Sequence, residues 1–133
     1  MDHLEAFLQS FIAKHHQYGW LLKLSKVKKN GNLLRGMDAL HRHLDERFCM
    51  LIPNGSPQYE VDFVRQALSK YKLTSCYMLS ADDRFHQQTI PLDDALQRIM
   101  GTSSTSILSF IPGRVALFEG HSTGERYLCI RES

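Results

Sequence analysis

The spacing of apolar residues changes near residue 48, and this change constrains the fold more than any other feature of the sequence. Before it, apolar side chains recur every three or four positions, beginning at positions 4, 7, 8, 11 and 12. That period is typical of an amphipathic helix, and Asp2 is placed to cap the first one. After it, short uninterrupted apolar runs are typical of buried strands. The 133 residues therefore predict a single domain (1–133), with a helical layer over 1–47 and a mixed-sheet portion over 48–133.

The helical layer should contain three helices. The first should fade near Tyr18 and Gly19, with a short second helix following it around Trp20. A third is predicted over about 33–48, where apolar residues again recur at spacings of three and four. Because the apolar residues around Trp20 follow a helical period, we expect its indole to lie in the core.

The sheet-containing portion should begin with one βαβ unit. The apolar runs at 48–52 and 74–80 predict two strands, and Ser56 and Pro57 are typical of an N-cap and first helical residue between them. Two strands joined in this way are expected to be parallel, with a right-handed crossover.

The remaining chain predicts an antiparallel meander. Residues 81–89 should be a polar connection, and Pro91 should begin another helix. Pro112 and Gly113 occupy the two central places of a predicted type II turn. The last three strands are expected at 106–111, 115–118 and 127–130. The whole order predicts a fold between α/β and α+β, with about five strands in a mixed sheet.

Basic charge collects in the first third of the chain. Residues 1–44 carry seven basic and three acidic side chains, whereas residues 45–100 carry six basic and eight acidic ones. Either surface could meet a partner of opposite charge. The candidate binding residues are Lys26, Lys28, Lys29 and Arg35 on the basic side and Asp93 and Asp94 on the acidic side. The lysine cluster at 23–29 also permits a nucleic-acid partner, because lysines neutralise phosphates.

One loop carries side chains suited to catalysis. Asp82, Asp83, Arg84 and His86 follow the strand predicted at 74–80. The two carboxylates could bind a divalent metal or act in acid–base steps, with His86 as a proton shuttle and Arg84 opposite developing negative charge. This is the alternative of a small metal-assisted hydrolase or nuclease.

The cysteines predict a reducing compartment. Cys49, Cys76 and Cys129 are an odd number, widely spaced and each within an apolar run. They fit neither a disulfide framework nor a zinc motif, and the simplest interpretation is buried reduced thiols in the cytoplasm. No apolar run approaches the roughly 20 residues that span a bilayer, so no membrane partner is expected.

These observations favour a binding protein over an enzyme. The sequence contains no Walker A loop, dinucleotide fingerprint, HExxH, paired CxxC or EF-hand loop, and no cofactor or metal is predicted. We expect a small cytoplasmic protein-binding module, such as an inhibitor, an immunity-type partner or a regulatory subunit, acting through a charged surface.

Overall fold

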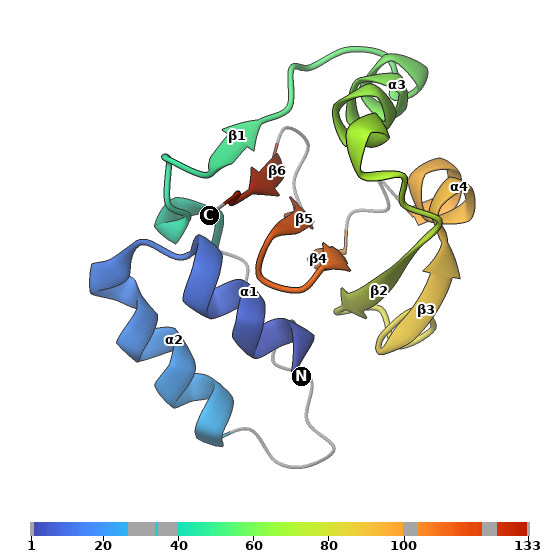
Figure 1. Ribbon diagram of the computed structural model, residues 1–133. Helices are drawn as coiled ribbons and strands as arrows, with labels where there is room; N and C mark the ends of the chain where they lie inside the picture. Colours follow the sequence, from blue (N-terminus) through green and yellow to red (C-terminus); the bar gives the residue numbers. More distant parts are fainter. Residues whose placement is uncertain (1, 27–33, 35–39, 100–103, 121–124, 133) are drawn as a thin grey trace.

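The computed structural model describes residues 2–26, 34, 40–99, 104–120 and 125–132 (Figure 1). Its helices are α1 (His3–Phe11), α2 (Lys14–Lys26), α3 (Pro57–Leu68) and the short α4 (Leu92–Asp94), with helical turns η2 (Leu40–His43), η3 (Ser69–Tyr71) and η4 (Ala95–Ile99). Its strands are β1 (Cys49–Leu51), β2 (Ser75–Ser80), β3 (Gln88–Pro91), β4 (Ser106–Ile111), β5 (Val115–Glu119) and β6 (Arg126–Ile130). The predicted α+β character, the N-terminal helices and the C-terminal meander are confirmed.

The first helix is shorter than its apolar pattern predicts. Asp2 caps α1 by accepting a hydrogen bond from the backbone N–H of Leu4 at 2.9 Å. The helix ends at Phe11 because Ile12 is extended and buried, pairing with Leu44 in an isolated bridge. Gln17 then donates to the Ile12 carbonyl, which satisfies an acceptor at the helix end. The predicted second helix is therefore the latter half of the longer α2.

The third predicted helix is broken within its described part. Of residues 33–48, the structure describes 34 and 40–48, and the turn η2 ends at His43. Asp45 accepts from the backbone N–H of Arg47 at 3.0 Å with its side chain and from Phe48 at 3.0 Å with its carbonyl. Such local side-chain bonds compete with a continued helix, so the chain turns here and enters β1.

The sheet is antiparallel throughout, which corrects the predicted mixed sheet. The strand order is β1-β6-β5-β4-β2-β3, and every neighbouring pair is antiparallel. The two strands of the predicted βαβ unit, β1 and β2, do run in the same direction. They are not neighbours, because the meander β4–β5–β6 lies between them and supplies an antiparallel partner to each.

Two strands differ from their predicted character. Residues 88–91, expected in a polar connection and a helix start, form an additional strand, β3, at one edge of the sheet. At the other edge, β1 leaves Met50 and Leu51 about half exposed, although its continuous apolar run predicted a buried strand. An edge position requires only one neighbouring strand, so apolarity alone does not bury it.

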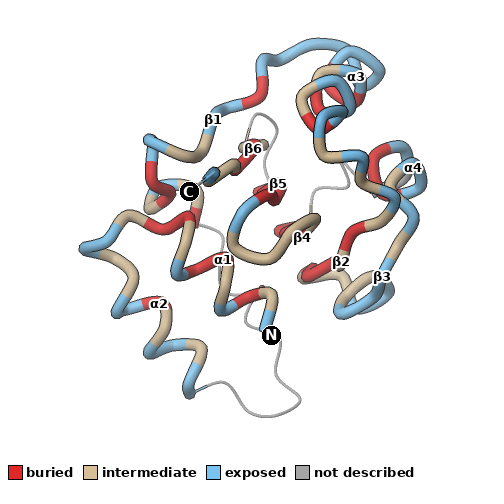
Figure 2. The backbone as a smooth tube through the Cα atoms, in the orientation of Figure 1, coloured by how far each residue is buried: buried red, intermediate tan, exposed pale blue. Residues whose placement is uncertain are grey.

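Alternating residues of the strands face two separate cores. On β5, Ala116 and Phe118 belong to the core beneath α1 and α2, whereas Val115 and Leu117 belong to the core beneath α3 and α4. The buried stretches of the central strands in Figure 2 lie between these two helical layers. This arrangement places α1 and α2 on one face of the sheet and α3 and α4 on the other.

The predicted type II turn is confirmed at Pro112–Gly113. Gly113 has φ of +73°, and the N–H of Arg114 donates to the Ile111 carbonyl at 2.9 Å. A Cβ on Gly113 would also approach the Ser10 hydroxyl to 3.0 Å, so both the backbone conformation and the nearby α1 favour glycine here.

Candidate functional site

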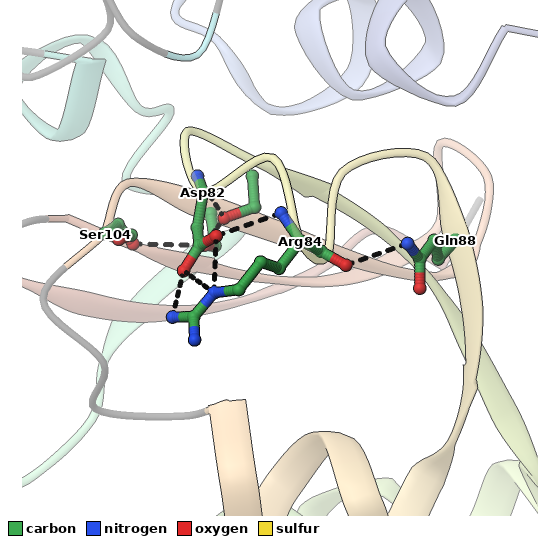
Figure 3. Close-up of polar contacts among 6 residues, drawn as sticks. Asp82, Arg84, Gln88 and Ser104 are labelled. Atoms are coloured by element: carbon green, nitrogen blue, oxygen red, sulfur yellow. Dashed lines mark hydrogen bonds and ion pairs between the residues drawn. The ribbon is translucent and has the colours of Figure 1, made fainter.

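The loop proposed for catalysis is the connection between the antiparallel strands β2 and β3. Within it, Arg84 donates to the Asp82 carboxylate through its backbone N–H at 3.0 Å and through its guanidinium at 2.7 Å (Figure 3). The Arg84 side chain is exposed. Its hydrogen bonds hold the pKa of Asp82 below the ordinary value. The loop thus brings Asp82 and Arg84 together as an ion pair.

The other two residues of this loop are oriented differently. His86 accepts a hydrogen bond at Nδ1 from the backbone N–H of Ser80 at 3.1 Å, which assigns the neutral ring's proton to Nε2. Asp83 lies in the exposed part of the loop. Across the described residues, no group of three or more His, Cys, Asp or Glu side chains is placed to hold a metal ion.

A buried polar row, which no local signal in the sequence predicts, crosses the sheet beside this loop. Ser80, Ser106, Glu119 and Arg126 are consecutive cross-strand partners on β2, β4, β5 and β6. The Ser106 hydroxyl donates to the Ser80 hydroxyl at 2.9 Å. The row therefore joins the end of the proposed catalytic loop to the opposite half of the sheet.

The charged end of this row is an ion-pair network with α3. Arg126 donates to Glu60 of α3 at 2.6 Å, and its Nε lies 3.6 Å from the Glu119 carboxylate. The side chains of Glu119 and Arg126 are 2% and 16% exposed, and Glu60 is also buried. One guanidinium thus faces two carboxylates in the interior, where an unpaired charge is strongly unfavourable. This geometry fixes α3 over the sheet.

The predicted acidic binding residues lie on the surface over α3 and α4. Asp93 forms an ion pair with Arg65 at 3.3 Å, with both side chains exposed, and Asp94 is exposed as well. On the basic side, Lys26 is exposed at the end of α2. Lys28, Lys29 and Arg35 lie outside the described residues.

The outer face of α2 combines basic and apolar side chains. Lys14, Tyr18, Leu22 and Lys26 are spaced four residues apart and are all exposed, with Tyr18 at 77% and Leu22 at 40%. Residues four apart lie on the same side of a helix, so these four form one stripe, here called the α2 stripe. In Figure 2 most of α2 is exposed or intermediate.

The inner face of α2 carries Trp20, which is buried as predicted. Its indole N–H donates to Nδ1 of His43 at 2.9 Å, and the ring of His43 stacks on that of His16 with centroids 3.8 Å apart. Burial, followed by repulsion from His16, His15, Lys23 and Arg42, lowers the pKa of His43 from its ordinary 6.5. Accepting from Trp20 requires the neutral ring.

We expect acid to weaken this contact. Because folding lowers the pKa of His43, the neutral imidazole contributes its full stabilisation above about pH 6.5. This stabilisation is lost as the pH falls through the pKa of His43 in the folded protein. Trp20 is the only tryptophan, so its fluorescence should fall with a midpoint below 6.5 as the neighbouring imidazole gains a proton. The His43→Gln variant, which keeps an acceptor, should lose this titration, and the control His86→Gln should retain it. An unchanged midpoint in His43→Gln would contradict the assignment.

None of the helices over the described residues is both long enough and apolar enough to cross a bilayer. Comparison of the chain with protein-family models, curated proteins and solved structures gave no match.

Proposed function

We propose that this chain is a small cytoplasmic protein-binding module, an inhibitor, immunity-type partner or regulatory subunit, that recognises an acidic protein surface through the α2 stripe. The observation that carries the proposal is the exposure of Tyr18 and Leu22 between Lys14 and Lys26. Tyrosine provides a large apolar contact with a polar tip and is enriched at interfaces. The lysines would steer an acidic partner to this contact.

The charge of α2 supports an acidic partner. The helix contains three lysines and no acidic residue, and the whole segment between Glu5 and Asp38 has none. Lys14 and His15 occupy the first turn, where the helix dipole favours acidic side chains. Positive charge in this first turn does not stabilise the helix. Its presence there therefore supports a role in binding.

The same surface favours protein over nucleic acid. Trp20, the aromatic residue among the lysines, is buried against His43 and is not available to stack on a base. The exposed apolar pair Tyr18 and Leu22 instead has the i, i+4 spacing of helix anchors that enter a protein groove. The free thiols of Cys49, Cys76 and Cys129 are compatible with the proposed reducing cytoplasm.

A photo-crosslinking amino acid at position 18 tests the proposal in cells that make the protein. We expect a crosslinked protein with an acidic surface, resistant to nuclease, and no such product from position 59. Tyr59 is the matched control, because it is an exposed tyrosine on α3. Crosslinking to nucleic acid, or an equal product from position 59, would overturn the proposal.

The purified partner then allows binding to be measured. Tyr18→Ala should weaken the complex tenfold or more, as expected for an interfacial anchor, while stability is unchanged because the side chain is exposed. Lys14→Gln with Lys26→Gln should lower the association rate and its salt dependence. Tyr59→Ala and Arg114→Gln should bind as the unmodified protein does. Equal affinity in the α2 variants would exclude this stripe as the interface.

A further inference from the structure

Two cysteines lie directly opposite each other in neighbouring antiparallel strands. Cys49 of the edge strand β1 is the register partner of Cys129 in β6. The hydrogen bonds on either side of this pair run from the Ile130 N–H to the Phe48 carbonyl and from the Ile52 N–H to the Arg126 carbonyl, both at 2.9 Å. Hydrogen-bonded and non-hydrogen-bonded pairs alternate along antiparallel strands. Because Phe48 and Ile130 form a hydrogen-bonded pair, the next pair, Cys49 and Cys129, is a non-hydrogen-bonded one.

Such a position suits a disulfide. Non-hydrogen-bonded antiparallel partners bring their Cα atoms to about 4.5 Å and their side chains close together, which lies within the Cα separations of about 4.4–6.8 Å found for disulfides. Little backbone movement is therefore needed to join the two sulfurs.

We propose that Cys49 and Cys129 form a reversible disulfide on exposure to a low-molecular-weight disulfide such as oxidised glutathione. The thiolate of Cys49, which is partly exposed, attacks one sulfur of the oxidant, and one glutathione leaves as a thiol. The thiolate of Cys129 then attacks Sγ of Cys49, and the second glutathione leaves as a thiol. The two cysteines are oxidised, the oxidant is reduced, and the protons of both cysteine thiols pass to the departing glutathiones.

The surroundings of the pair set the order of these steps. Cys129 is fully buried, and this burial raises its pKa, so it is the resolving thiol rather than the first nucleophile. Because β1 has three residues and only one neighbouring strand over the described chain, local opening of this edge gives Cys129 access to the mixed disulfide. Formation of the disulfide then links β1 covalently to β6.

Cys76 provides an internal control. It is buried, and burial raises its pKa to about 12. Its register partner is Ile90, and it faces the opposite core from Cys49 and Cys129. It should therefore take no part in the reaction.

The experiment incubates the folded protein in glutathione buffers of increasing oxidised fraction and follows its intact mass and its peptides under non-reducing conditions. The unmodified sequence and Cys76→Ala should each lose two hydrogens, with a single linked peptide pair containing positions 49 and 129. Cys129→Ala should stop at one glutathione adduct on Cys49, and Cys49→Ala should remain unmodified. The oxidised protein should unfold at a higher urea concentration, and dithiothreitol should reverse the shift.

Three outcomes would overturn the proposal: a disulfide containing Cys76, a stable glutathione adduct on the unmodified sequence, or free thiols at 49 and 129 under the most oxidising buffer. Because Cys129 is buried, Cys129→Ala could unfold. Differential alkylation of the unmodified sequence before and after oxidation tests the same pairing without that variant, since only Cys76 should stay reactive after denaturation of the oxidised protein.

Discussion

Replacing Arg126 with methionine should lower the free energy of unfolding by about 3–5 kcal/mol, the range typical of breaking a buried ion pair by removing one partner. The substitution keeps a long side chain but removes the cation between Glu60 and Glu119. Both carboxylates are buried, so each would have to remain charged without its guanidinium or take up a proton. Urea unfolding followed by circular dichroism measures the loss.

Two further variants test whether the loss of stability comes from the burial of the ion pair. Arg84→Met removes a guanidinium whose side chain is exposed, and it should leave stability nearly unchanged because exposed pairs contribute little. Adding Glu60→Gln and Glu119→Gln to Arg126→Met should recover much of the lost stability, because these substitutions remove the two buried carboxylate charges that faced the guanidinium. If Arg126→Met alone costs less than about 1 kcal/mol, the network is accessible to solvent and does not hold α3 in place.

Truncating Phe118 to alanine should also cost about 3–5 kcal/mol, as is usual for a large buried aromatic residue. Phe118 is fully buried on β5, where its ring lies 6.4 Å from that of Phe7, which in turn lies 5.3 Å from that of Phe11. This aromatic cluster joins α1 to the sheet. Truncating Phe118, the member of this cluster on β5, leaves a cavity that the rings of the neighbouring residues fill only in part.

Urea unfolding again gives the measurement, with Tyr59→Ala as the control. Tyr59 is a half-exposed aromatic residue on α3, so its truncation should change stability by no more than about 0.5 kcal/mol. Phe118→Leu, which retains most of the volume, should cost less than about 1.5 kcal/mol. A similar small loss for Phe118→Ala would show that α1 does not depend on this cluster for its packing.

The elements that sequence alone predicted are those whose signals are local. Asp2 caps α1, Ser56 caps α3 by accepting from the N–H of Tyr59 at 3.1 Å, and Pro112–Gly113 forms the expected turn. Each signal acts over a few residues, so no knowledge of the rest of the chain is needed. The meander strands follow for the same reason, since short turns join neighbours.

Features that depend on distant partners could not be predicted in this way. The direction of β1 and β2 follows from the helix between them, but their separation is set by β4, β5 and β6, which come later in the sequence. The Asp82–Arg84 pair lies within one loop, whereas Glu60 and Arg126 meet only in the folded sheet. One signal of a buried charge was available in the sequence. Glu119 follows Val115 and Leu117 at a spacing of two residues, so it lies on the same inward face of the strand.

The pairing of β1 with β6 also determines when the sheet can be completed. As the chain is synthesised, residues 49–51 of β1 emerge long before residues 126–130 of β6, the strand with which β1 pairs. During that interval β1 has no strand to join, and β5 lacks its neighbour on one side. Distant pairings of this kind slow folding and leave strand edges open to other chains. The nascent protein is therefore most prone to aggregate just before its sixth strand is made.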